Sequence, residues 1–243
     1  MAKRYGLPLG VAVRYVLVDP EVDSFTYLID NIDELASLLA RVLPGSRSEI
    51  WRYLAEVQHD PALKRALTQP FRRWVWSKRH LRPRGYHLIC WAAIRAIKPD
   101  AVVETGILDG MASVVMLAAL ERNRGEGHEG DLFSFDVMPD TGVLVPEELR
   151  DHWRPTYEDG AIAIQRVLRG RRVGVLASDS LRDETQIKAE FDQVMAVRGP
   201  ELFAVTTWGD LDVFGWSAAE VVRFQERPVG HFYRGVNHAF ARL

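Results

Sequence analysis

The chain has 243 residues, which suits one α/β domain with an appendage or two small domains. Its net charge of -2 and pI of about 6.4 argue against nucleic acid or an anionic membrane as the main partner. The single cysteine, Cys90, excludes an internal disulfide and a cysteine zinc site. The chain shows neither the apolar core of a signal peptide nor the roughly 18 apolar residues that span a bilayer, so we expect a soluble cytoplasmic protein.

Residues 1–84 are predicted to form an N-terminal helical extension and cap. Apolar residues at helical spacing follow a capping residue near Asn31, and similar patterns recur over 48–57 and 61–67. Residues 70–84 are rich in arginine and tryptophan. They form either a linker packed on the main domain or a cap over an acidic ligand, and we favour the linker. An extension of this kind often mediates dimer contacts, so a homodimer is a further expectation.

Helices and strands alternate through residues 85–243, which we predict to be the main domain. An amphipathic helix over 85–97 leads into an apolar strand at 101–103. Further strands are predicted over 132–136, 153–157, 173–177 and 202–207, helices over 110–121, 161–168, 183–197 and 217–225, and a hairpin over 231–243. This order predicts an α/β fold with a Rossmann-like, doubly wound, mostly parallel seven-stranded sheet and a C-terminal antiparallel hairpin.

Acidic residues follow the predicted parallel strands. They are Glu104, Asp136, Asp159, Asp179 and Asp210. The carboxyl ends of parallel strands meet at one edge of a sheet, where ligands bind in such folds. Any one of these acids could simply cap a helix, but the whole set predicts a functional site at that edge.

The stretch Ala101–Ser113, AVVETGILDGMAS, reads as a strand, a glycine turn and the start of a helix. Glycines let the backbone approach a ligand, and a new helix presents free N–H groups. A dinucleotide fingerprint has glycine where Glu104 stands, and a carboxylate there would repel a pyrophosphate. The pattern therefore favours a ligand with a cationic end and no phosphate, such as S-adenosylmethionine, over NAD. A Walker A loop is absent from the sequence.

The stretch VVETGILDGMAS followed by LFSFDV resembles motifs I and II of class I S-adenosylmethionine-dependent methyltransferases. Within that class, the ETG form and the later SDS are similar to the macrocin O-methyltransferase and cephalosporin hydroxylase-like group. The resemblance covers roughly residues 84–243. It implies an enzyme that methylates a hydroxyl of a small molecule, a sugar or another natural-product acceptor, by in-line displacement.

The resemblance also implies a set of cofactor-binding residues. They are Glu104, Thr105, Gly106, Gly110, Ser113, Asp136, Val137, Asp159, Gly160, Ala161 and Asp179. Glu104 would lie against the methionine end of the cofactor, Asp136 would bind the ribose hydroxyls, and residues 159–161 would border the adenine. Asp179 would lie beside the reacting methyl group, so it is the predicted catalytic base.

A metal site is a secondary expectation from the same resemblance. In macrocin-type enzymes, acids after the fourth and fifth strands bind Mg²⁺, and Asp179 and Asp210 match these positions. The pattern departs from that family, because Ala177 and Ser178 precede Asp179 and a single acid stands at 210. A hard cation needs several oxygen ligands, so we rank a metal-independent reaction first.

Other interpretations stay open at this level. The chain could be a cephalosporin hydroxylase-like protein, a non-catalytic cofactor-binding member of the fold, or an NAD-dependent oxidoreductase. His152 and His231 are weaker candidates for a base, and His238 is predicted to be packed and hydrogen-bonded in a strand. Trp153 and Trp208 either line an acceptor pocket or belong to the core.

Overall fold

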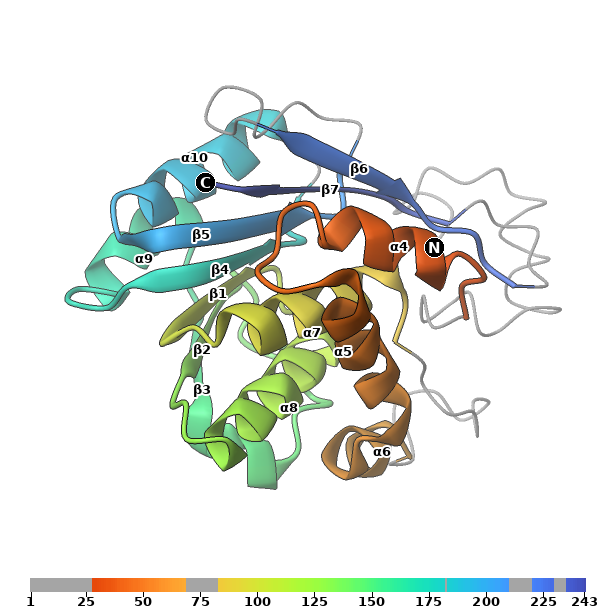
Figure 1. Cartoon of the computed structure of the whole chain (residues 1–243). Helices are drawn as coiled ribbons and strands as arrows, with labels where there is room; N and C mark the ends of the chain where they lie inside the picture. The colour runs from red at the N-terminus through yellow and green to blue at the C-terminus, as the bar shows by residue number, and fades with distance from the viewer. Residues whose placement is uncertain (1–27, 69–82, 182, 210–219, 230–234) are drawn as a thin grey trace, which may run out of the picture.

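The computed structural model describes residues 28–68, 83–181, 183–209, 220–229 and 235–243. A seven-stranded sheet runs through the centre of this part of the chain, in the order β3-β2-β1-β4-β5-β7-β6 (Figure 1). The strands are β1 (Ala101–Thr105), β2 (Asp131–Phe135), β3 (Trp153–Thr156), β4 (Val173–Ser178), β5 (Arg198–Thr206), β6 (Val221–Gln225) and β7 (Asn237–Arg242). Strands β1 to β5 are parallel, while β7 runs antiparallel to both β5 and β6. The predicted Rossmann-like sheet with a C-terminal antiparallel hairpin is thereby confirmed.

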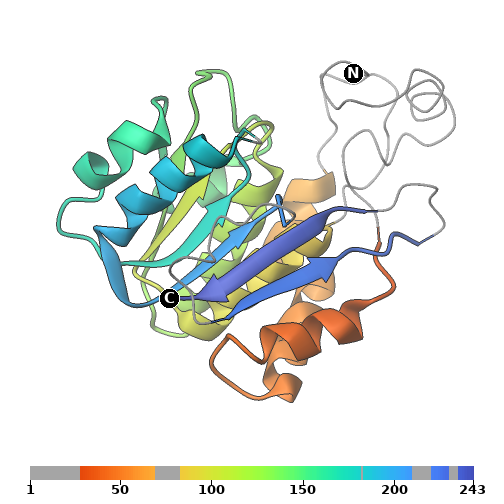
Figure 2. The ribbon, with the colours of Figure 1, turned by 90° about the horizontal axis from the view of Figure 1, so that it is seen from above.

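Helices cover both faces of the sheet, as Figures 1 and 2 show. The helices are α4 (Ile32–Leu39), α5 (Arg47–His59), α6 (Pro61–Thr68), α7 (Gly85–Ile97), α8 (Met111–Gly125), α9 (Gly160–Val167) and α10 (Glu184–Met195), with a 3₁₀ turn, η1, over Glu147–His152. One face carries α7 and α8, on which α5 and α6 pack from outside, and the other carries the pair α9 and α10. No helix among the described residues is long and apolar enough to cross a membrane.

Burial on both faces explains why the inner strands read as apolar runs. Every residue of β1 is buried. Val102 packs with the α7–α8 side, whereas Ala101 and Val103 pack with the α9–α10 side. Because side chains alternate along a strand, the last two residues of β1, Glu104 and Thr105, also point to opposite faces.

The C-terminal part corrects one prediction. The helix predicted over 217–225 is wrong in its described part, because Val221–Gln225 forms strand β6. Val222 and Phe224 are buried while Arg223 and Gln225 are exposed, which is the two-residue period of a strand with one solvated face. Strand β7 pairs with β6, so the hairpin partner lies earlier in the chain than predicted, and residues 230–234 lie outside the described residues.

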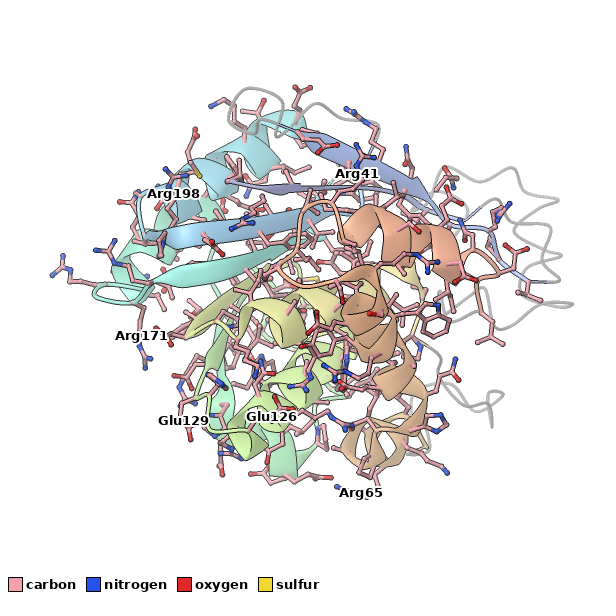
Figure 3. The ribbon with its side chains drawn as sticks, viewed as in Figure 1. Arg41, Arg65, Glu126, Glu129, Arg171 and Arg198 are labelled. Atoms are coloured by element: carbon pink, nitrogen blue, oxygen red, sulfur yellow. The ribbon has the colours of Figure 1, made fainter. Side chains whose placement is uncertain are left out.

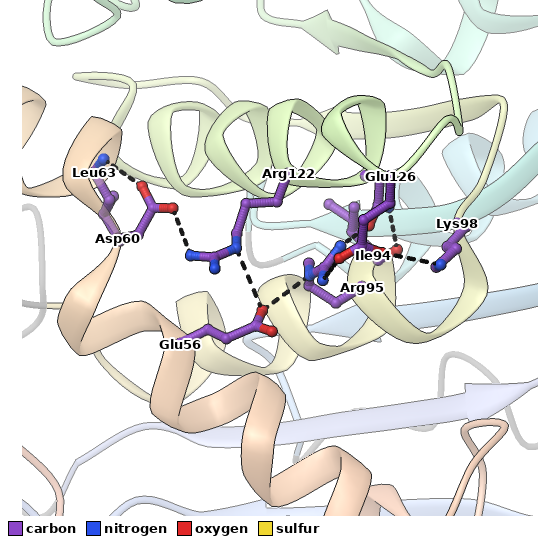
Figure 4. Close-up of polar contacts among 9 residues, drawn as sticks. Glu56, Asp60, Leu63, Ile94, Arg95, Lys98, Arg122 and Glu126 are labelled. Carbon is purple, nitrogen blue, oxygen red and sulfur yellow. Dashed lines mark hydrogen bonds and ion pairs between the residues drawn. The ribbon is translucent and has the colours of Figure 1, made fainter.

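The N-terminal helices share their core with the sheet domain. Their buried residues, such as Leu35 of α4 and Leu54 of α5, belong to the same apolar cluster as α7 and α8. Arg95 of α7 reinforces this junction, because its guanidinium donates to Glu56 of α5 and to Glu126, which directly follows α8 (Figure 4). The division at residue 84 stays a prediction, while the described helices of the extension pack as part of the main body.

Candidate functional site

The carboxyl ends of β1, β2 and β4 meet at one edge of the sheet. In the strand register, Thr105 at the end of β1 pairs with Phe135 of β2 and with Ser178 of β4. Asp136 directly follows β2 and Asp179 directly follows β4, so the level strand ends bring these two acids to the same edge as Glu104. The opposite edge is marked in Figure 3 by Arg171 and Arg198, which precede β4 and begin β5.

Two glycines shape the loop between β1 and α8. Gly106 has φ +86°, and a Cβ on it would meet the backbone oxygen of Asp179 at 2.4 Å. Gly110 has φ +90°, and a Cβ there would meet the Cα of Gly142 at 2.8 Å. Both positions require the left-handed conformation and a close backbone approach, which glycine alone tolerates without strain. These glycines let the loop lie close to the backbone at Asp179 and Gly142, and Gly110 is the residue before the first turn of α8.

Glu104 is completely buried on the α7–α8 side of the sheet. Its Oε2 accepts hydrogen bonds from Ser113 Oγ at 2.7 Å and Ser134 Oγ at 2.5 Å. Its Oε1 is buried with no hydrogen-bond partner among the described residues. Burial raises the pKa of Glu104 to about 8, against the lowering effect of the two serine hydroxyls. The carboxyl is thus a closed site with one unused acceptor oxygen.

Asp136 organises the loops that border the edge. Its Oδ2 accepts from the backbone N–H groups of Ile107 and Leu108 at 2.9 and 3.2 Å, and its Oδ1 accepts from Met138 N at 2.9 Å. The carboxylate therefore ties the glycine loop to the segment after β2, a role that the sequence did not predict. The next residue, Val137, is 70% exposed and lies open at the edge.

Asp159 stands at the start of α9 and caps it. Its Oδ1 accepts from the backbone N–H of Ala161 at 2.9 Å and from Gln186 Nε2 at 2.7 Å. Gly160 between them is buried, and a Cβ there would touch Thr105 Cγ2 at 3.3 Å. The predicted acid-glycine-alanine turn therefore lies directly against the end of β1.

Asp179 is the half-buried acid at the end of β4, with 31% of its side chain exposed. Thr207 Oγ1 donates to its Oδ1, and the guanidinium of Arg84 lies 3.8 Å from its Oδ2. Burial raises the pKa of Asp179, while Arg84 and the Thr207 hydrogen bond act in the opposite direction. Access to solvent and a raised pKa are what a carboxylate base at this edge requires.

The first turn of α7 completes the site, and no sequence pattern predicts its part in it. Glu226, which directly follows β6, is fully buried against this turn. Its Oε1 accepts from His238 Nε2 at 2.7 Å and from Tyr86 N at 3.3 Å. Arg84, which reaches Asp179, directly precedes this turn. No spacing pattern marks these residues, because they come from three distant parts of the chain.

The histidines and tryptophans considered for the site differ in burial and in their distance from this edge of the sheet. His238 is fully buried and hydrogen-bonded, as predicted. His152 lies at the opposite edge, where it borders a polar hollow of about 520 Å³ and stands 3.4 Å from Asp131, so it is not a base for this site. Trp153 belongs to the core and donates to Ser134, while Trp208 is half-buried. His231 lies outside the described residues.

The magnesium expectation gains no support. No group of three or more histidine, cysteine or acidic side chains suited to a metal occurs within the described ranges. Asp210 lies outside those ranges. Asp179 instead has Arg84 and Thr207 as partners.

Exposed apolar residues gather in the loops around the acids. In the loops that follow β1, β2 and β4, Leu108 is 51%, Met138 55%, Val143 56% and Leu181 75% exposed. The backbone N–H of Gly142 donates to Leu108 O, which holds two of these loops together. Large exposed apolar side chains that gather in one region indicate a binding surface. The edge therefore combines carboxylates with an apolar rim.

Sequence comparison gives a match to a family model described as a methyltransferase domain, over residues 103–200. The matched segment includes Glu104, Asp136, Asp159 and Asp179. It covers less than half of the chain, and it supports a methyltransferase domain over these residues. No curated protein matches the chain significantly in sequence.

Solved structures resemble this chain at low identity. A candidate O-methyltransferase from Klebsiella pneumoniae has a TM-score of 0.51 and 10% identity, over 79% of this chain and 95% of that one. TomG from Streptomyces achromogenes, an O-methyltransferase of tomaymycin synthesis solved with its cofactor, has a TM-score of 0.49 and 14% identity over the same shares. At 10% identity the first of these likenesses supports the fold assignment, namely a Rossmann-like methyltransferase fold.

Proposed function

We propose that the protein is an S-adenosylmethionine-dependent O-methyltransferase that acts on a hydroxyl of a small molecule. The observation that carries this proposal is the methyltransferase-domain match over residues 103–200, which spans the strand-end acids. The narrower assignment to the macrocin O-methyltransferase and cephalosporin hydroxylase-like group rests on the ETG and SDS motifs alone. A sugar or another natural-product hydroxyl is the proposed acceptor.

The residues at the edge suit the chemistry of this cofactor. The Oε1 of Glu104, which has no partner among the described residues, would accept from a cationic donor such as an ammonium group once the carboxyl is ionised. Because Glu104 is closed from solvent, its neighbours must shift for a ligand to reach it. Gly106, Gly110 and Ser113 would border the methionine end. Asp136, Val137 and residues 159–161 would border the adenosine end.

Asp179 is the proposed base of the reaction. S-adenosylmethionine supplies an electrophilic methyl group on a sulfonium sulfur. A hydroxyl acceptor must lose its proton to become a good nucleophile, and the Asp179 carboxylate can accept that proton. Arg84 and Thr207 hold the carboxylate in place through its two oxygens, which fixes the direction of proton transfer. The apolar rim would bind the body of the acceptor.

Binding and turnover test the proposal in two steps. Calorimetry should detect S-adenosylmethionine and S-adenosylhomocysteine binding, with NAD as the comparison ligand. Methyl transfer from labelled S-adenosylmethionine to a panel of hydroxylated sugars and phenols should then identify an acceptor. Absence of S-adenosylmethionine binding at millimolar concentration would refute the proposal, and NAD binding in its place would favour an oxidoreductase.

A further inference from the structure

Glu190 is a buried acid on the inner face of α10. Its side chain is 3% exposed, although its neighbours on that face, Ile187, Phe191 and Val194, are core residues. A charged or polar group in such a place costs free energy unless hydrogen bonds compensate it. Burial raises the pKa of Glu190, and hydrogen bonds from its three partners lower it.

Two of the three partners, Thr105 and Ser180, belong to segments at the candidate site, and the third, Gln186, lies one turn earlier on α10. Oε2 of Glu190 accepts from Thr105 Oγ1 at 2.7 Å and from Ser180 Oγ at 3.0 Å. Thr105 ends β1 and directly precedes the Gly106 turn, while Ser180 directly follows Asp179. The loops that follow the neighbouring strands β1 and β4 therefore both donate a hydrogen bond to the same carboxyl oxygen of Glu190.

The second oxygen of Glu190 is linked to the start of α9 through the side chain of Gln186. Its Oε1 accepts from Gln186 Nε2 at 3.0 Å, and the same amide donates to Asp159 Oδ1 at 2.7 Å. Packing adds to this link, because a Cβ on Gly160 would stand 3.5 Å from Glu190 Cγ. Glu190 and Gln186, one turn apart on α10, therefore connect the segments that follow β1, β3 and β4.

We infer that Glu190 is a positioning residue that holds these three strand-end segments in the arrangement that binds the cofactor. The inference rests on the proposed function. Glu190 acts through Thr105, Ser180 and Gln186, and it lies behind the edge at which the ligand would bind. On the opposite face, Ser113 and Ser134 hold Glu104 in a comparable way, so the end of β1 is fastened from both sides.

Glu190→Gln tests the inference with little change in side-chain volume. The amide replaces one acceptor oxygen by a donor, which faces either the two hydroxyls or Gln186 and cannot accept from them. We expect the Kd for S-adenosylmethionine, measured by calorimetry on the folded protein, to rise at least tenfold. The matched control is Asp192→Asn on the same helix, an exposed residue paired with Lys188, and it should leave Kd unchanged.

Gln186→Met is the second variant, because Gln186 is only half-buried and its loss should not prevent folding. It removes both links of the amide, so Kd should rise several-fold. A purely structural role would lower the thermal midpoint of either variant while the folded fraction kept the wild-type Kd, and that result would overturn the inference. Wild-type protein that fails to bind S-adenosylmethionine would instead refute the proposed function, and the inference with it.

Discussion

Glu104 shows how far the role of one side chain depends on its surroundings. The residue is predicted to lie against the methionine end of the cofactor, and its buried carboxyl accepts hydrogen bonds from Ser113 and Ser134. Because burial raises its pKa to about 8, the native protein holds a proton there at neutral pH that the unfolded chain releases. The stability of the fold should therefore depend on this group.

The sign of that dependence can be tested with Glu104→Gln. The pKa of Glu104 is 4.5 in its ordinary environment and about 8 in the native protein. Between these two pH values the native state binds more protons than the unfolded state, so the free energy of unfolding falls as pH rises. The contribution of Glu104 is fully present below pH 4.5 and is lost by the time the pH passes 8, with a size of up to about 5 kcal/mol. Urea unfolding of both proteins across pH 5–8 should show a flatter profile for the variant. Parallel profiles would contradict the proposed burial effect.

Asp179 allows a test of catalysis at the same scale. Asp179→Asn keeps an acceptor for Thr207 but cannot take a proton from the acceptor hydroxyl. We expect kcat to fall by about 10²–10⁴-fold, a larger effect than any change in the Kd for S-adenosylmethionine. In the wild type, kcat should fall at acidic pH as Asp179 becomes protonated, and this acidic limb should vanish in the variant. Asp140→Asn, an exposed position after β2, is the control, and undiminished turnover in Asp179→Asn would remove the residue from the reaction.

At the scale of elements, the first turn of α7 is held by a residue from the far end of the chain. Glu226 faces the positive end of the helix and accepts from Tyr86 N, while Val236 N donates to its other oxygen. His238 lies between the rings of Tyr86 and Phe224, with centroid distances of 6.0 and 6.4 Å. The β6–β7 hairpin thereby fixes the turn from which Arg84 reaches Asp179.

Gly85 is the tightest point of this contact. A Cβ there would meet Glu226 Oε1 at 2.6 Å, so Gly85→Ala should destabilise the protein by about 1–3 kcal/mol. The matched control is Gly125→Ala at the end of α8, where a Cβ would meet nothing within 4 Å. That substitution should be neutral or stabilise by up to about 1 kcal/mol, because alanine favours a helix over glycine. Equal thermal midpoints for the two variants would contradict the packing described.

At the scale of the whole molecule, the described N-terminal helices and the sheet domain form one packed body. Arg95 lies at their junction with 3% of its side chain exposed, and its guanidinium bonds to Glu56, Asn123 and Glu126. Arg122 of α8 adds a second link, to Asp60 at 3.1 Å (Figure 4). A shared core and a buried ionic junction predict that the two parts unfold together.

Arg95→Ala should weaken both the junction and the whole fold. Removal of the guanidinium leaves the buried Asn123 and the largely buried Glu56 without this hydrogen-bond donor, which costs about 1–3 kcal/mol. Arg52→Ala is the control, because Arg52 is exposed although it stands over the same Tyr53 ring as Arg95, each at 5.3 Å from the centroid. Its effect should stay within about 0.5 kcal/mol. Calorimetry should show one transition in both variants, shifted to lower temperature only in Arg95→Ala.

Several elements could be predicted closely from local signals. Helix α7 begins and ends at the predicted residues 85 and 97. The bounds of α5, α6, β1 to β4 and α9 differ from their predictions by at most two residues at either end. The exception is β6, where Glu220 after a serine mimics a capping signal, while the alternation of Val222 and Phe224 decides for a strand. A short segment carries both signals, and pairing with β7 chooses between them.

The sequence by itself determined the alternating α/β order, the strand-end acids and the glycine turn, because each depends on residues that are neighbours in the chain. Only the tertiary structure decided what those acids touch. In it, Glu104 is buried, Asp136 accepts hydrogen bonds from the loops after β1 and β2, and Arg84, Glu190 and Glu226 lie close to the site. Such contacts join residues far apart in sequence, and their hydrogen bonds and burial exist only once the sheet has gathered its strand ends.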